Sequence, residues 1–250
     1  MSGHSKWSTI KHKKAMVDAR RGKMFTKLIR ELTSAARAGG GDPDVNPRLR
    51  TAVASAKGAN MPNDTIQRAI QKGTGEIAGE TYEEVTYEGY GAGGVAVLVD
   101  TLTDNKNRTV AEIRHLFARH GGSMGENGCV AWMFQRQGFL ALDAASIDED
   151  ALLELVLEAG GDDVKTENDL YEILTSPEAF EDVRSSLEAQ GLTPEVAEVT
   201  MLPQSTVSIE GKQAEQVLRL MEALDDQDDV RRAYANFDIP DDVMAALAAS

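Results

Sequence analysis

The sequence contains one cysteine, Cys129, and no long apolar run. A single cysteine excludes an intrachain disulfide, and nothing in the sequence indicates an oxidising compartment. No stretch reaches the roughly 18 apolar residues that suggest a membrane span, and the first residues lack the apolar core of a signal peptide. We therefore expect a cytoplasmic protein that makes no membrane contact.

The signatures of common catalytic and metal sites are missing as well. There is no P-loop, no G-x-S-x-G, no C-x-x-C and no H-E-x-x-H. His115 and His120 do not have the i, i+4 spacing of a helical ligand pair, and Cys129 begins a predicted strand, where a small core residue is the commoner role. We predict that the chain is not an enzyme and needs neither a cofactor nor a metal ion.

Two glycine-rich stretches resemble phosphate-binding loops, but each is followed by a predicted strand where such a loop needs a helix. GYGAGG, residues 89–94, fits the dinucleotide fingerprint G-x-G-x-x-G, but that fingerprint needs a helix after the glycines and this sequence supplies a strand. A hairpin turn is the better prediction. GGSMGENG, residues 121–128, is also followed by a predicted strand, 129–134, and is expected to be a flexible turn.

Charge is distributed very unevenly along the chain. The formal net charge is −15, yet residues 1–75 hold 15 basic residues against 5 acidic ones, a net charge of +10. Residues 76–250 hold the other 11 basic and 36 acidic residues, a net charge of −25. A basic module attached to an acidic body indicates that one part of the chain contacts nucleic acid.

The basic charge is concentrated in residues 1–30, which carry nine lysines and arginines against the single acid Asp18. A solvated arm, a transit peptide or a membrane-surface helix could have this composition, although a spacer and a broad apolar face are missing. We favour a polyanionic partner, with Trp7 stacking on a base or sugar. The predicted nucleic-acid-binding residues are Lys6, Trp7, Lys11, His12, Lys13, Lys14, Arg20, Arg21, Lys23, Lys27 and Arg30.

Three amphipathic helices are predicted after the basic segment. The apolar stripe of residues 25, 28, 29 and 32 indicates a helix over 14–38, from which the basic side chains should face outward. Asn46 followed by Pro47 predicts the cap and first position of a second helix that stops near Gly58. A third helix is expected from Asn63 or Asp64 to Gly73.

Strand periodicity begins at residue 82 and predicts the rest of an α+β fold. A polar loop, 103–109, should lead into a helix over 109–120, capped by Asn107 or Thr109. Residues 137–203 have the βαββαβ order of a ferredoxin-like unit. We predict a three-helix domain, 1–78, and two α/β sandwich-like domains: a discontinuous one, 79–135 plus 204–250, and an inserted ferredoxin-like one, 136–203.

Clustered carboxylates are frequent in the acidic body. Asp162 with Asp163, and the run from Asp225 to Asp229, are expected to be solvated loops, because nothing nearby in the sequence would raise a pKa for acid catalysis. The second run also lacks the glycine and terminal glutamate of a calcium loop.

Several long motifs, in the same order, make the chain resemble the YebC/PmpR family. They are GHSKW (3–7), IKHKK (10–14), RGKMFTKLIRE (21–31), NPRLR (46–50), AKGANMPNDTIQRAIQKGTG (56–75), YEGYGAGGVAVLVD (87–100), TDNKNRT (103–109) and GGSMGENGCVAWMF (121–134). The resemblance runs nearly end to end and rests on general pattern alone over 137–203.

The resemblance implies three domains and a non-enzymatic role in gene expression. Members of the family are described as transcriptional regulators that bind DNA in the cytoplasm. Some resemble translation factors that act at the ribosome on proline-rich stretches, and mitochondrial relatives activate translation of cytochrome c oxidase. The expected partner is therefore nucleic acid, either DNA or ribosomal RNA. A protein partner docked on the acidic C-terminal domains is a third interpretation.

Overall fold

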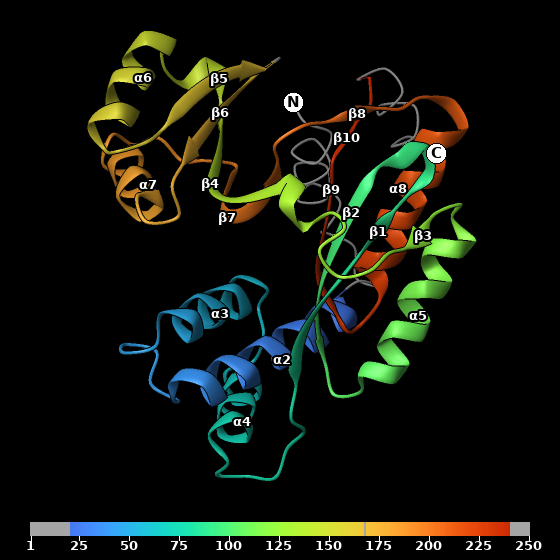
Figure 1. The fold of residues 1–250 in the computed structure, drawn as a ribbon. Coiled ribbons are helices and arrows are strands. Elements are labelled where there is room, and N and C mark those ends of the chain that lie inside the picture. The colour runs from blue at the N-terminus through green and yellow to red at the C-terminus, as the bar shows by residue number, and fades with distance from the viewer. Residues whose placement is uncertain (1–20, 168, 241–250) are drawn as a thin grey trace. The chain divides into compact units, whose positions relative to one another are not determined.

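The computed structural model describes residues 21–167 and 169–240 (Figure 1). The predicted α+β class is confirmed: a three-helix domain is followed by two α/β domains, one of which is ferredoxin-like. By their contacts the described residues form two compact units. One unit contains residues 21–129 and 210–233, and the other contains residues 130–209 and 234–240.

The three-helix domain packs around a core of small and aliphatic side chains. Its helices are α2 (Arg21–Gly39), α3 (Pro47–Gly58) and α4 (Asn63–Thr74). The predicted stripe of α2 does face this core, although its first turns are only half-buried. The buried residues are Leu32, Ala35, Ala36, Leu49, Ala52, Ala56, Met61, Ile66, Ala69 and Ile70.

The link between α2 and α3 is fixed by one buried amide. The Asn46 side-chain oxygen accepts from the backbone N–H of Leu49 at 3.1 Å, which caps α3, and Pro47 occupies the first position of the helix as predicted. The amide nitrogen of Asn46 donates to the carbonyl oxygens of Ala35 and Gly40, both at 2.9 Å. One side chain thus satisfies backbone groups at the end of one helix and the start of the next.

A glycine lets α4 approach α2 closely. A Cβ atom at Gly73 would lie 2.4 Å from the carbonyl oxygen of Thr33 and 2.7 Å from the Cβ of Ala36. Both distances are too short for non-bonded atoms, so only glycine fits there without a shift of the backbone.

The first α/β domain is built on a four-stranded sheet with the order β3-β1-β2-β9. Residues 89–94 form the turn region of the antiparallel β1–β2 hairpin, which confirms the hairpin prediction over the dinucleotide fingerprint. The strands are β1 (Glu83–Tyr90), β2 (Ala96–Thr103), β3 (Ser123–Met124) and β9 (Val230–Ala235), with the short helix η2 (Ala92–Gly94) in the turn.

Two helices, α5 (Lys106–Arg119) and α8 (Gly211–Asp226), lie side by side against this sheet (Figure 1). The predicted cap of α5 is wrong, because the helix begins earlier: the Asn105 side chain accepts from the N–H of Arg108 at 3.1 Å. The buried side chains of these helices include Ile113, Phe117, Val217, Leu220, Met221 and Leu224.

Residues from the end of the chain complete the sheet. Strand β9 lies next to β2, and the N–H of Leu102 donates to the carbonyl oxygen of Asp229 at 2.8 Å. This places residues 210–233 in the unit formed by residues 21–129. The exact three-domain boundaries remain a prediction.

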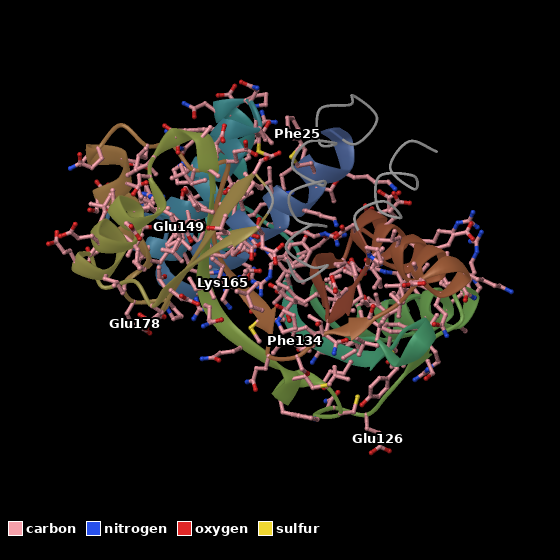
Figure 2. All side chains as sticks on the ribbon, turned by 90° about the horizontal axis from the view of Figure 1, so that it is seen from above. Phe25, Glu126, Phe134, Glu149, Lys165 and Glu178 are labelled. Carbon is pink, nitrogen blue, oxygen red and sulfur yellow. The ribbon has the colours of Figure 1, made fainter. Side chains whose placement is uncertain are left out.

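The ferredoxin-like domain has the predicted βαββαβ order and an antiparallel sheet, β5-β6-β4-β7. Exposed acidic side chains, among them Glu149 and Glu178, lie on its outside (Figure 2). Its elements are β4 (Phe134–Asp143), η4 (Ala144–Ser146), α6 (Glu149–Glu158), β5 (Asp163–Glu167), β6 (Leu170–Thr175), α7 (Phe180–Ala189) and β7 (Val196–Pro203), followed in the same unit by the parallel pair β8 (Val207–Ser208) and β10 (Phe237–Asp238).

The strand predicted over 129–134 is wrong. A short helix, η3 (Ala131–Met133), occupies most of that range, and β4 begins only at Phe134. The preceding segment, 121–128, was expected to be a flexible turn, but it pairs with β1 through the short strand β3 and makes further bonds to β1 beyond it. The N–H of Gly125 donates to the carbonyl oxygen of Glu88 at 2.8 Å, and the N–H of Gly128 donates to the Glu88 carboxylate at 2.6 Å.

Candidate nucleic-acid interface

Only part of the predicted interface falls within the described residues. Four of the predicted residues lie on α2: Arg21, Lys23, Lys27 and Arg30. The others, Lys6, Trp7, Lys11, His12, Lys13, Lys14 and Arg20, lie outside the described residues.

Three of the α2 cations contact the same acidic segment. We call residues 225–229 the acidic turn; they comprise the last two residues of α8 and the three residues that connect it to β9. The ammonium of Lys23 lies 3.5 Å from the Asp226 carboxylate, and the ammonium of Lys27 donates to the backbone carbonyl of Asp225. Arg30 forms an ion pair with the Asp229 carboxylate and donates to the carbonyl oxygen of Asp228 at 2.7 Å.

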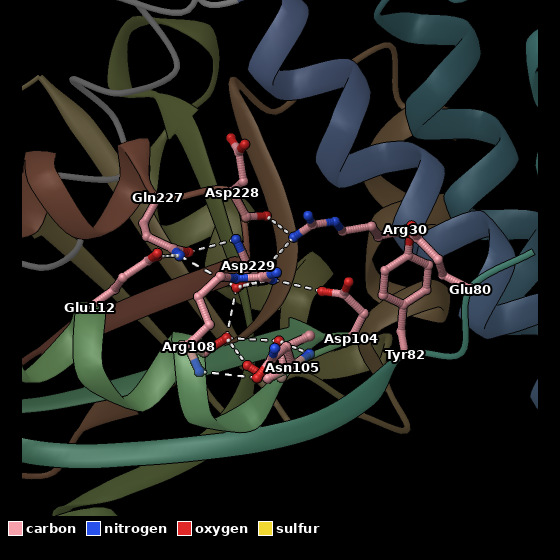
Figure 3. A network of polar contacts seen from close by, with 12 residues as sticks. Arg30, Glu80, Tyr82, Asp104, Asn105, Arg108, Glu112, Gln227, Asp228 and Asp229 are labelled. Atoms are coloured by element: carbon pink, nitrogen blue, oxygen red, sulfur yellow. Dashed lines mark hydrogen bonds and ion pairs between the residues drawn. The ribbon is translucent and has the colours of Figure 1, made fainter.

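Asp229 is the centre of this contact (Figure 3). Only 2% of the residue is exposed, and its carboxylate receives Arg108 at 2.8 and 3.0 Å and the Thr109 hydroxyl at 2.6 Å, besides the ion pair with Arg30. Gln227 closes the turn, because its side-chain oxygen accepts from the N–H of Asp229. A carboxylate this buried is stable only because several donors from different elements surround it.

The same donors determine the protonation of the network. Burial by itself would raise the pKa of the Asp229 carboxyl, but hydrogen bonds from Thr109 and Arg108 and the charge of Arg30 hold that pKa below its ordinary value. Hydrogen bonds to Asp229 and then to Asp104 raise the pKa of Arg108. Asp229 and Arg108 are therefore both charged at neutral pH.

The guanidinium of Arg30 is enclosed from a second direction. It lies 5.6 Å from the centroid of the Tyr82 ring, close enough for a cation–π contact. The Tyr82 hydroxyl donates to Glu80 at 2.8 Å, and burial together with this hydrogen bond raises the pKa of Tyr82 to about 12. Arg30 is thus held between Tyr82, which immediately precedes β1, and the acidic turn.

A second ion-pair cluster holds the neighbouring face of α2. Glu31 accepts from the Arg48 guanidinium of α3 at 2.8 Å and lies 3.6 Å from Arg231 of β9. Arg48 also pairs with Glu84 of β1. Arg30 and Glu31 are thus adjacent on α2 but have different partners. Arg30 pairs with Asp229, which precedes β9, and Glu31 pairs with Arg48 of α3 and Arg231 of β9.

These contacts correct two predictions. The acidic run was expected to be a solvated loop, but Asp229 within it is buried. Arg30 was expected to face outward, but its side chain is 15% exposed and points to Asp229, as Figure 3 shows. The partners are nearly 200 residues apart, so the only signal in the sequence was the opposite charge of residues 21–30 and 225–229.

The helical domain also carries cations that the sequence analysis did not include. They are Arg50 and Lys57 of α3 and Arg68 and Lys72 of α4. All four are exposed, and none forms an ion pair with another described residue. They add to the positive charge of this domain and lie on helices other than α2.

Over residues 21–167 and 169–240, no helix combines the length and apolar character needed to cross a membrane. No group of three or more histidine, cysteine or acidic side chains in these ranges could hold a metal ion.

Comparison with known proteins places the chain in a family. The model described as TACO1/YebC protein N-terminal domain matches residues 5–76, and the model described as TACO1/YebC second and third domain matches residues 82–237. A protein of Syntrophobacter fumaroxidans is 59% identical over 99% of this chain and all of its own length, and one of Desulforapulum autotrophicum is 58% identical with the same coverage. Both are named "Probable transcriptional regulatory protein".

A solved structure agrees with this placement. The crystal structure of a conserved hypothetical protein from Aquifex aeolicus has a TM-score of 0.80 and 50% sequence identity, and the match covers 93% of this chain and 96% of that one. With both family models matching, the resemblance noted in the sequence is confirmed, and this chain belongs to the TACO1/YebC family.

Proposed function

We propose that this protein is a nucleic-acid-binding regulator of gene expression whose basic N-terminal segment binds the phosphate backbone. The observation that carries the proposal is the net charge of +8 on residues 1–30 in a chain of net charge −15. The relatives named as transcriptional regulators support the same role. In this proposal the lysines and arginines of the segment neutralise phosphates, while Trp7 and His12 contact bases or sugars.

The described contacts divide the α2 cations by role. Lys23 has a half-exposed side chain and is available to a phosphate, whereas Arg30 is shielded by Tyr82 and Asp229. Arg30 therefore supports the interface from behind by fixing α2, and the phosphate contacts are made by the cations that precede it.

The test is a charge reversal with a matched control. We expect Lys11→Glu/Lys13→Glu/Lys14→Glu to abolish binding to a fluorescein-labelled DNA duplex and leave the melting temperature unchanged. Arg50→Glu/Lys57→Glu/Arg68→Glu changes the net charge equally on the same domain and should retain most of the affinity. Equal losses in both variants would show that net charge alone matters and would remove the N-terminal segment from the interface.

Salt dependence gives an independent measure of the same contact. If about five to eight cations neutralise phosphates on duplex DNA, the slope of log K against log salt is roughly −4 to −7. A slope near zero for the unaltered protein would contradict a phosphate-binding role.

A second candidate is a ribosome-associated translation factor that relieves stalling at proline-rich stretches. The observation that favours it is the charge of −25 on residues 76–250, since like-charge repulsion would keep this part clear of RNA while the basic segment is inserted. Co-sedimentation with ribosomal subunits that is lost after nuclease treatment would favour this candidate over duplex DNA. Capture of a partner that survives nuclease would favour protein docking on the acidic domains.

A further inference from the structure

One helix end in the first unit carries charge of the unfavourable sign. Helix α8 ends in Asp225 and Asp226, has no basic residue in its last turn, and is followed by two more aspartates of the acidic turn. Carboxylates are disfavoured at a helix C-terminus, where the exposed carbonyls already carry partial negative charge. Helix α2 carries cations on the described residues that face this end, among them Lys23. The end of α8 thus lacks a counter-charge within its own helix.

Cations of α2 supply the counter-charge to this end of α8. Residues 23, 27 and 30 have i, i+4, i+7 spacing and form one stripe along α2. That stripe meets the acidic turn at the carboxylates of Asp226 and Asp229 and at the carbonyl oxygens of Asp225 and Asp228. The turn therefore occupies a row of side chains that the proposed function assigns largely to phosphate.

The contact has an inner part and an outer part of different strength. In the inner part the Asp229 side chain is 1% exposed, and loss of its charge would leave Arg30 and Arg108 without their main partner. In the outer part the Lys23 and Asp226 side chains are 49% and 56% exposed. Such surface pairs contribute about 0–1 kcal/mol and are screened by salt, so a stronger anion can displace this part while the inner part holds α2 in place.

We infer that the acidic turn is a selectivity element that acts as a built-in anionic competitor for the α2 stripe, with the Asp226 carboxylate in contact with Lys23 and the charges of Asp225 and Asp228 beside it. The inference rests on the proposed function. An intramolecular competitor has an effective concentration on the order of millimolar, so a ligand with few phosphates does not displace it efficiently. A long strand that engages many N-terminal cations at once does. The acidic turn thus selects for extended polyanions over mononucleotides and short oligonucleotides.

The test neutralises the turn without removing its backbone contacts. In Asp225→Asn/Asp226→Asn/Asp228→Asn the carbonyl oxygens that accept from Lys27 and Arg30 remain, and Asp229 is untouched. The control Glu149→Gln/Asp162→Asn/Glu178→Gln changes the net charge by the same amount at exposed positions of the ferredoxin-like domain. Binding of fluorescein-labelled single-stranded RNA of 6 and of 24 nucleotides is measured by anisotropy at low salt, and thermal melting verifies that both variants fold.

We expect the turn variant to bind the 6-nucleotide RNA up to about fivefold more tightly than the control variant does, because the one surface ion pair that the substitutions remove, between Lys23 and Asp226, is worth up to about 1 kcal/mol. The gain for the 24-nucleotide RNA should be smaller. If the unaltered protein binds the long RNA and the turn variant matches the control on both lengths, the competitor is excluded while the proposed function stands. If none of the three proteins binds either RNA or a DNA duplex, the proposed function fails and the inference with it.

Discussion

Arg30 and Asp229, 199 residues apart in the sequence, form an ion pair in which the carboxylate is buried and the guanidinium is largely shielded. The pair joins the first described helix to the residue that precedes strand β9. The three-helix domain and the first α/β domain are therefore coupled in stability, and the variants below test that coupling.

Loss of the charge at Asp229 should destabilise the chain strongly. Replacement by asparagine preserves shape but leaves Arg30 and Arg108 without their shared carboxylate, and removing one partner of a buried pair costs about 3–5 kcal/mol. We expect the lower end of that range for Asp229→Asn in urea unfolding, because Arg108 stays partly solvated. Asp228→Asn, where only the backbone carbonyl bonds Arg30, is the control and should change little. Equal stability of the two variants would contradict the central role of Asp229.

The stability of this unit should fall in acid. Burial raises the pKa of Asp229, but its hydrogen-bond donors and the charge of Arg30 lower it, and the net shift is downward. Glu31 shows the same balance: burial raises its pKa, Arg48 and Arg231 lower it, and the net shift is again downward. A carboxyl with a depressed folded-state pKa adds stability above its unfolded value, which is about 4, and that stability is lost as the pH falls through the folded value. Urea midpoints should therefore decrease from about pH 5 to pH 3. A shallower decrease is expected in Asp229→Asn, and an identical slope would exclude Asp229 as a source.

The Asn46 amide gives a third test. Asn46→Ala removes the cap of α3 and the donors to two carbonyl oxygens, so the free energy of unfolding should fall by about 1–2 kcal/mol. The same substitution at Asn63 is the control. Asn63 starts α4, is exposed and makes no side-chain hydrogen bond to another described residue, so Asn63→Ala should stay within about 0.5 kcal/mol. Chemical denaturation followed by circular dichroism measures both.

The close approach of α4 to α2 can be probed with one methyl group. Gly73→Ala forces a Cβ onto Thr33 and Ala36 and should destabilise the chain by about 1–3 kcal/mol. Gly58→Ala adds the same atom at the end of α3, where nothing lies within 4 Å, and should be neutral or slightly stabilising. If both variants melt at the same temperature, the interhelical distance is not limited by Gly73.

What could be predicted from the sequence depended on how far apart the interacting residues are. Three features that depend on neighbours within a few positions were predicted correctly. They are the start of α3 at Asn46 and Pro47, the apolar stripe on α2 and the βαββαβ order. The cap of α5 was misplaced because TDNKNRT offers several residues that cap equally well, and only the structure identifies Asn105.

The errors at the candidate site have a different cause. Nothing near the acidic turn in the sequence distinguishes the buried Asp229 from the exposed Asp228, because the donors come from α2 and α5, more than 100 residues away. Glu88 is a similar case, since its buried carboxylate accepts from the N–H of Gly128, which is 40 residues away in the sequence. Charge complementarity between segments can suggest such contacts, but it cannot identify the pairs.

The return of residues 210–233 to the unit begun by residues 21–129 also constrains how the protein folds as it is made. While a ribosome is still translating residues 130–209, strand β2 has an open edge where β9 will lie, and it is one of the most apolar strands of the chain. The ferredoxin-like segment buries its own core and can fold at that stage. The sheet begun by β1 and β2 is therefore completed only after the ferredoxin-like segment has been made, and the nascent chain must keep the open edge of β2 from aggregating until β9 emerges.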